Sequence, residues 1–299
     1  MIANPALQRL GFAPDDRVVI LHADDIGMCH ATLPAFADLV DFGLMSSAAT
    51  MVPCPWFLAA AAYCRDHPDV DMGVHLTLNS EWATYRWKPL STSDPASGLL
   101  DDEGSFHHRQ APVYERATVE AVDAEVRAQV DRALVAGIDV THIDTHMGTA
   151  GHAQFFPGYV RLGLEHRVPC RVLRLDEEGW RRARGMDAES AAAAAQTVRH
   201  LEEQGVPLFD HFTGLPLKDP SDRVAVAKAR LDALPPGLSL LIFHPAQDTG
   251  ELRAIAPDWQ SRVADYQTFT SPELRDHIRR TGIQIIGYRP LRDLMRSAP

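Results

Sequence analysis

Residues 21–28, LHADDIGM, mark the point where the first expected strand ends and buried polar side chains begin. The apolar run VVIL at 18–21 leads into them and predicts a buried strand, and Gly27 predicts the turn that leaves it. Adjacent carboxylates such as Asp24 and Asp25 resist joint ionisation. A cation relieves this conflict if one Asp ligates it and the other stays free as a base. The alternative is an Asp pair in a surface turn or at a helix N-cap.

Expected strands and helices alternate along the chain, which predicts parallel βα units. The expected strands are residues 17–23, 47–52, 70–78, 139–144, 170–175, 207–212, 238–243 and 283–286. Two stretches, 79–116 and 246–270, lack clear periodicity and are expected to be long loops. No G-x-G-x-x-G turn follows the first strand, so a dinucleotide-binding sheet lacks its main signature. Seven or eight βα units predict one α/β domain over residues 1–299, an irregular TIM-like (β/α) barrel.

The composition is that of an ordinary acidic globular protein. The chain has 299 residues, of which 45% are hydrophobic and 23% charged, and its formal net charge is −11. It has no Lys/Arg-rich run and no apolar stretch of membrane-spanning length, so nucleic acid and membranes are poor candidate partners. Residues 1–17 lack the pattern of a secretory signal, and four cysteines without a CxxC pair indicate free thiols in a reducing compartment. We therefore expect a cytoplasmic protein.

Among the histidines in or just past expected strands, three are candidate site residues. His75 lies in the third strand, His146 follows the fourth and His244 follows the seventh. Barrel enzymes build their sites at the carboxyl ends of the strands, so we expect Asp25, His75 and His146 to converge. Two imidazoles and one carboxylate suit a catalytic divalent metal, and ligand softness favours zinc over magnesium or manganese. Taken alone, His75 is also explained as a half-buried strand residue and His244 as a strand cap.

The motif THIDTH at 141–146 carries three polar side chains at alternating positions, His142, Asp144 and His146. Alternation places all three on one face of a strand. A polar stripe facing a barrel interior is costly unless it meets a metal or a substrate. His22, His142 and His152 remain spare ligands for a second metal.

Four motifs together resemble those of one family. LHADDIG, GVHLTLNSEW, THIDTHMGT and FHPA occur in this order and spacing, and the chain is similar to the YdjC-like carbohydrate deacetylases (the ChbG/HpnK family) from about residue 17 to residue 290. The resemblance implies a distorted (β/α) barrel that uses a metal to remove acetyl groups from N-acetylated sugars. His22 and the sequence THMGT are departures, since many relatives carry Asn before ADD and a longer histidine run after the fourth strand.

Motif positions imply a role for each residue. By this resemblance Asp25, His75 and His146 are the metal ligands, Asp24 is the general base, and His244 is a general acid or oxyanion partner. Two further residues are expected to support them: Asp144 by orienting a ligand histidine and Arg174 by holding a carboxylate such as Asp24.

The expected reaction is hydrolysis of the acetamide of an N-acetylated amino sugar, which is also the expected partner, and a homodimer is compatible with the sequence. The expected sugar-stacking wall is formed by Trp82, Tyr85, Arg86 and Trp87, unless that loop packs on its own aromatic rings. The alternatives are a phosphoesterase, an amidohydrolase acting on a non-sugar amide, and a non-catalytic protein that binds metal or sugar.

Overall fold

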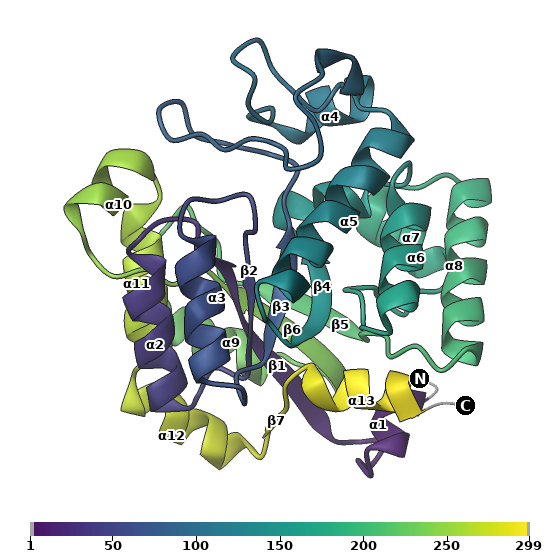
Figure 1. Cartoon of the computed structure of the whole chain (residues 1–299). Coiled ribbons are helices and arrows are strands. Elements are labelled where there is room, and N and C mark those ends of the chain that lie inside the picture. The colour runs from purple at the N-terminus through teal and green to yellow at the C-terminus, as the bar shows by residue number, and fades with distance from the viewer. Residues whose placement is uncertain (1–2, 298–299) are drawn as a thin grey trace.

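The computed structural model describes residues 3–297, and in this part of the chain seven parallel strands form one sheet (Figure 1). Their order is β4-β3-β2-β1-β6-β5, and the short β7 also pairs with β1. The strands are β1 (Arg17–Ile26), β2 (Ser47–Thr50), β3 (Met72–Leu76), β4 (Val140–Thr145), β5 (His211–Gly214), β6 (Gly237–Phe243) and β7 (Gln284–Ile285). The alternation of strands and helices expected from the sequence is therefore confirmed. β1 is a central strand of the sheet.

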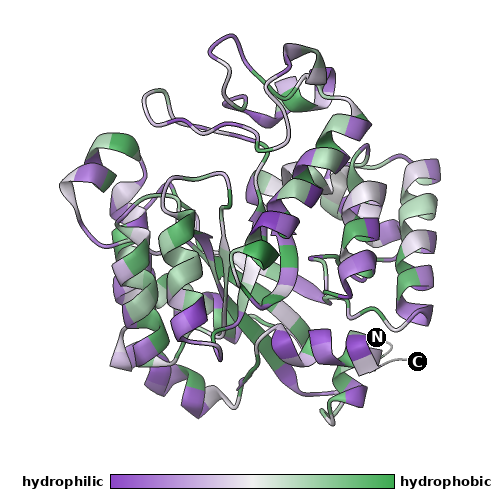
Figure 2. Cartoon of the chain, viewed as in Figure 1, coloured by the Kyte–Doolittle hydropathy of each residue, from purple (hydrophilic) through white to green (hydrophobic). Residues whose placement is uncertain are grey.

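Helices cover the sheet on its flanks, and Figure 2 shows that these helices carry both apolar and polar residues. The helices are α1 (Pro5–Arg9), α2 (Thr32–Phe42), α3 (Phe57–Asp66), α4 (Gln110–Arg116), α5 (Val119–Val135), α6 (Phe156–His166), α7 (Glu177–Arg184), α8 (Ala188–Glu203), α9 (Arg223–Asp232), α10 (Gly250–Ile255), α11 (Trp259–Phe269), α12 (Pro272–Thr281) and α13 (Arg289–Ser297), with 3₁₀ turns η1 (Pro95–Ser97) and η2 (His146–Gly151). Among the described residues, no helix has both the length and the apolar character needed to cross a membrane.

Both faces of β1 are buried, as is usual for a central parallel strand. Val19 and Leu21 pack into the large core under the helices, whereas Val18 and Ile20 pack into a second cluster that also contains Tyr288. We call this second side of the sheet the inner face. Because side chains alternate along a strand, the inner positions after Ile20 belong to polar residues that approach the site.

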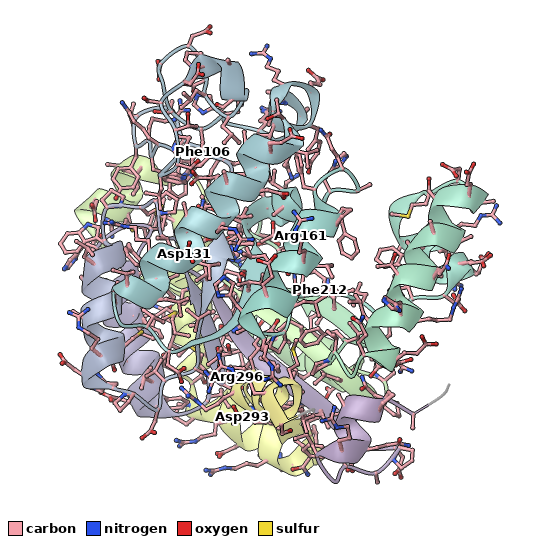
Figure 3. The ribbon with its side chains drawn as sticks, turned by 45° about the vertical axis from the view of Figure 1, so that its right-hand side comes forward. Phe106, Asp131, Arg161, Phe212, Asp293 and Arg296 are labelled. Carbon is pink, nitrogen blue, oxygen red and sulfur yellow. The ribbon has the colours of Figure 1, made fainter. Side chains whose placement is uncertain are left out.

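The sheet does not close into a regular barrel, so the TIM-like barrel is not confirmed. The expected strand 170–175 makes only two isolated bridges, Ile143 with Cys170 and Leu173 with Phe209. The reason is local: the amides of Val172 and Leu175 donate to carbonyls two residues earlier, in γ-turn fashion. These bonds take up donors that a continuous ladder would need. β5 therefore remains an edge strand, on which Phe212 is exposed (Figure 3).

The second expected loop, 246–270, is largely helical, and that expectation was wrong. It contains α10, which Thr249 caps by accepting a hydrogen bond from the Leu252 amide, and α11. The buried face of α11 is mostly polar and comprises Ser261, Arg262, Asp265, Thr268 and Phe269. A polar buried face produces no hydrophobic periodicity, which explains the error. The first expected loop, 79–116, contains only η1 and α4 and is otherwise irregular.

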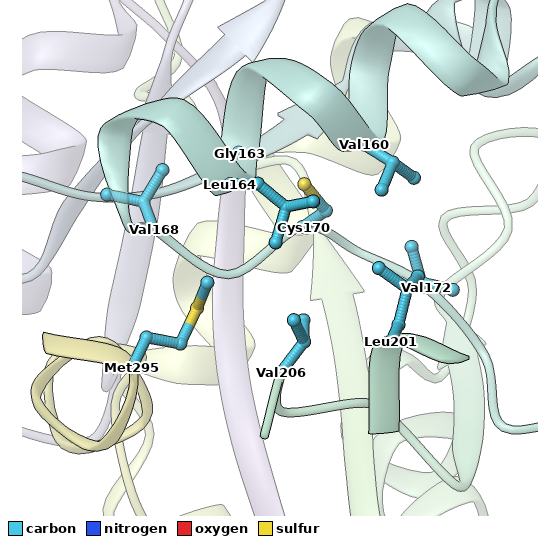
Figure 4. A pocket seen from close by; sticks show the side chains of 9 residues that line it. All are labelled: Val160, Gly163, Leu164, Val168, Cys170, Val172, Leu201, Val206 and Met295. Carbon is cyan, nitrogen blue, oxygen red and sulfur yellow. The ribbon is translucent and has the colours of Figure 1, made fainter. Parts of the chain in front are cut away.

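Two features of the interior carry no chemistry of their own. All four cysteines are free, as expected, and all four are buried. An apolar cavity of about 10 Å³ lies under α6, lined by residues such as Val160, Cys170 and Met295 (Figure 4). A volume of that size holds about one water at most, and its walls offer no polar partners. It reflects the packing of α6 against α8 and α13.

Candidate active site

A β-bulge near the end of β1 presents both carboxylates of the Asp pair to one site. Ala23 pairs with Ala48 and Ile26 with Thr50, so Asp24 and Asp25 lie opposite a single residue of β2. Asp25 has a φ of 64°, a left-handed conformation that Asp tolerates better than most residues. Neighbouring side chains of a regular strand point to opposite faces. The bulge removes that restriction.

Three lone-pair donors converge at the carboxyl ends of β1, β3 and β4. Asp25 Oδ1 lies 3.3 Å from His75 Nε2 and 3.2 Å from His146 Nδ1. These three residues, which we call the ligand cluster, are buried and offer atoms within 4.8 Å of one another. Among the described residues, Asp25 Oδ1 has no hydrogen-bond partner. A buried carboxylate oxygen without a partner between two imidazoles is costly unless a cation is bound, so this donor set fits a divalent metal.

Each histidine of the ligand cluster is held by a second carboxylate. His75 Nδ1 lies 2.7 Å from Asp144 Oδ1, and His146 Nε2 lies 3.1 Å from Glu81 Oε2. Such contacts fix which ring nitrogen faces the cluster. Burial lowers the pKa of His146, but Glu81 and Asp25 outweigh it and raise that pKa to about 9. Asp144 occupies the orienting position expected from the sequence, whereas Glu81 was not anticipated.

Arg262, on α11, neutralises the remaining charge of Asp25. Its Nη1 lies 2.7 Å from Asp25 Oδ2, its Nε lies 3.0 Å from Asp258, and its guanidinium covers the Trp82 ring. Burial would raise the pKa of Asp25, but Arg262 and then His146 hold it well below the usual range. Arg262 was not anticipated from the sequence because it lies in a stretch that was expected to be a loop. The helical spacing of Asp258, Arg262 and Asp265 was the available signal.

We expect Arg262→Met to destabilise the metal-free protein by about 3–5 kcal/mol, because it leaves the buried Asp25 carboxylate without its partner. Urea unfolding of the chelator-treated protein would measure this change. The matched control is Arg127→Met, which removes an exposed guanidinium from its pair with Glu165 and should change stability very little. Equal losses of unfolding free energy in the two variants would show that the buried Arg262–Asp25 pair stabilises the protein no more than an exposed pair does.

Asp24 lies beside a buried histidine, His22, on the inner face. His22 Nε2 lies 3.2 Å from Asp24 Oδ1 and 3.3 Å from Asp144 Oδ2. His22, Asp24 and Asp144 form a second group whose atoms lie within 4.8 Å of one another. His142 lies behind them, with its ring stacked on Tyr288. The polar stripe expected along β4 is therefore present, and it is continuous with the Asp pair.

His244 approaches Asp24 from β6. Its Nε2 lies 3.7 Å from Asp24 Oδ2, while Asp24 Oδ2 is 3.9 Å from His75 Nε2. The amide of His244 donates to Asp265 Oδ2, and Asp265 in turn pairs with Arg223. Burial lowers the pKa of His244, so its ring is neutral at pH 7. Asp24 thus lies between the ligand cluster and a neutral imidazole.

Several expected site residues have other partners. Arg174 holds two carboxylates, Asp210 at 2.7 Å and Glu202 at 2.5 Å, and it lies in the segment 170–175, which makes only isolated bridges. Its expected contact with Asp24 stays a prediction. His152 stacks on Tyr114 and does not join the ligand cluster.

The residues expected to form the sugar-stacking wall are mostly buried within their own loop, so that expectation is corrected. Arg86 is bound to Asp101 and to the carbonyl of Phe106, and Trp87 is 3% exposed with its indole N–H donating to the Asn79 carbonyl. Trp82 is 7% exposed beneath Arg262. This loop packs on its own aromatic rings, because those rings supply the core that an irregular segment otherwise lacks.

The ligand cluster lies at the carboxyl ends of parallel strands, with the carboxylate of Asp24 and the neutral ring of His244 beside it. This arrangement is that of a candidate hydrolytic site. Residues 18–280 match the family model described as YdjC-like protein, and the chain belongs to this family.

Two relatives and one solved structure are similar to this chain along nearly their whole length. The chain is 33% identical over 269 residues to the carbohydrate deacetylase of Thermus thermophilus, covering 90% of this chain and 92% of the relative. It is 22% identical over 272 residues to that of Thermoanaerobacter pseudethanolicus, covering 91% and 98%. Its fold is similar to the crystal structure of a putative cellobiose-phosphate cleavage protein from Enterococcus faecalis, with a TM-score of 0.76, 22% identity and coverage of 92% and 99%.

Proposed function

We propose that this protein is a metal-dependent carbohydrate deacetylase that hydrolyses the acetamide of an N-acetylated amino sugar. The observation that carries the proposal is the ligand cluster with Asp24 beside it and His244 within 3.7 Å of Asp24. The two relatives named carbohydrate deacetylase support the substrate class. Asp25, His75 and His146 are the proposed metal ligands, with zinc favoured and magnesium or manganese as alternatives.

A divalent ion held by the ligand cluster would polarise the acetamide carbonyl and make water acidic enough to attack it near neutral pH. The protein's own residues position the protons. Asp24 accepts the proton of the attacking water through Oδ2, the carboxylate oxygen that lies 3.7 Å from His244 Nε2. His244 begins neutral, takes up this proton when its Nε2, which lies 3.7 Å from Asp24 Oδ2 here, comes within hydrogen-bond distance of Asp24, and donates it to the leaving amine.

We expect the acid limb of kcat/KM, measured at saturating metal, to lie below pH 6.5, the ordinary pKa of histidine. A neutral His244 is required at the start, so activity is lost as the pH falls through its pKa, and burial has lowered that pKa. The measurement is a pH profile of acetate release from pH 4.5 to 9 at fixed ionic strength. A limb at or above pH 6.5 that disappears in His244→Gln would contradict this assignment.

The test of the proposed function is acetate release from N-acetylglucosamine and its oligomers, measured beside phosphomonoester and simple acetamide substrates in metal-loaded and chelator-treated protein. We expect acetate from the sugars only, and only with metal. Metal-dependent phosphate release without acetate would favour a phosphoesterase. His22, Asp24 and Asp144 would then be the candidates for the second cation such enzymes use. Metal binding without turnover of any substrate would favour a binding protein.

A further inference from the structure

Phe212 is an exposed aromatic residue on the inner face of the sheet, the face that carries the site. It is 44% exposed, although it lies within β5. In the β5–β6 register Phe212 pairs with Leu240 and Gly214 with Ile242, and Leu240 belongs to the inner-face cluster. Paired residues of parallel strands project to the same side. Phe212 therefore points to the same side of the sheet as Leu240.

The same registers connect Phe212 to the site. Ile242 of β6 pairs with His22 of β1, and His22 contacts Asp24. The inner positions along β6 are thus Leu240, Ile242 and then His244. Phe212 lies at the level of Leu240, two inner positions before His244 on the neighbouring strand.

The ring of Phe212 is uncovered for two structural reasons. The next inner position of β5 is Gly214, which has no side chain, and a Cβ there would lie 2.7 Å from Ile242 Cγ1. The segment 170–175 makes only isolated bridges and so adds no continuous strand beside β5. Figure 3 shows Phe212 at this edge of the sheet. Its exposure results from the backbone around it.

Arg171 joins Phe212 to the ligand cluster. Its guanidinium carbon lies 5.0 Å from the centroid of the Phe212 ring, and its Nη2 donates to the carbonyl of Thr145, the residue before His146. Burial lowers the pKa of Arg171, but the charges of Asp144 and Asp24 outweigh it and raise that pKa. Arg171 is therefore within electrostatic reach of the site and fixes the Phe212 ring relative to it.

We propose that Phe212, backed by Arg171, is the platform on which a pyranose ring of the substrate lies while its acetamide reaches the ligand cluster. This inference rests on the proposed function. The C–H groups on one face of a pyranose are apolar and pack against an aromatic ring, while Arg171 can donate hydrogen bonds to ring hydroxyls. The platform replaces the wall at 82–87, whose tryptophans are buried.

The test compares Phe212→Ala with Phe212→Tyr and with Val135→Ala, which truncates an apolar side chain that is 90% exposed at the end of α5. We expect Phe212→Ala to raise KM for N-acetylglucosamine oligomers about five- to tenfold with a much smaller change in kcat, because stacking contributes mainly uniform binding. Phe212→Tyr keeps the ring and should stay within about twofold of wild type. Val135→Ala should match wild type.

Calorimetric binding of N-acetylglucosamine oligomers to the metal-loaded proteins separates this proposal from the proposed function. If wild type binds the sugar without releasing acetate and Phe212→Ala weakens binding, the deacetylase function fails and the platform stands. An unchanged KM and sugar affinity in Phe212→Ala would overturn the platform while leaving the function intact. So would a change in oligomeric state alone, which would assign the ring to a subunit contact. Wild-type protein that neither binds nor turns over these sugars would overturn both.

Discussion

Replacing Asp24 with Asn should lower kcat for acetate release by about 100- to 10,000-fold, the usual contribution of a general base, while one divalent ion stays bound. Asn is nearly isosteric and keeps an oxygen toward His22, but it cannot accept the proton of the attacking water. Asp24 Oδ2 lies 3.9 Å from His75 Nε2, farther than the 3.3 Å of Asp25 Oδ1, so its loss should leave the ligand cluster in place.

Turnover and metal content measured on the same Asp24→Asn sample check this prediction. Asp248→Asn is the control, since Asp248 pairs with Arg253 at an exposed position and should keep wild-type kcat. If Asp24→Asn lost its metal and Asp25→Asn kept it, the two carboxylates would have the opposite roles.

Replacing His75 or His146 with Ala should weaken metal binding by at least about 100-fold, the upper end of the loss typical for a residue that only orients a ligand. Acetate release should fall in parallel. His107→Ala is a matched control, because His107 and His146 are each 4% exposed and His107 binds the Gly98 carbonyl outside the ligand cluster.

Metal affinity, measured by competition with a chromogenic chelator, decides this second prediction. The histidines are better probes than Asp25, because removing the Asp25 carboxylate also leaves Arg262 buried without its partner and so changes stability as well. Undiminished affinity in a His75→Ala, His146→Ala double variant would remove both residues from the metal site.

The meeting of Asp25, His75 and His146 could be predicted because each residue follows or ends a strand with an unambiguous apolar pattern. Parallel strands bring such ends to one edge of a sheet, whatever the sequence distance between them. The same reasoning located Asp144 on the face of β4 that leads to His146. These predictions need only strand assignment and alternation.

The sequence could not predict that Asp24 and Asp25 both face one site, because this depends on a β-bulge that the alternation of side chains does not reveal. The prediction of a closed barrel was wrong because two amides in the segment 170–175 donate hydrogen bonds to carbonyls within the same segment, which leaves the strand ladder incomplete. Arg262 and Glu81 were missed because each lies in a stretch without apolar periodicity. The wrong expectation for the aromatic loop has a related cause. Composition identifies the tryptophans of this loop, but only the structure shows whether a ring is exposed to a ligand. Phe212 is more exposed than Trp82 and Trp87.

Titration of metal-free protein with a divalent ion, with acetate release from N-acetylglucosamine oligomers followed in the same samples, tests the ligand cluster most directly. Zinc should be tried first, then manganese and magnesium. We expect activity to rise linearly with bound ion and to saturate at about one ion per chain, because the ligand cluster offers one set of converging donors. Acetate release that persists without metal, or that reaches its maximum only with a second bound ion, would contradict the assignment of one catalytic ion to the ligand cluster.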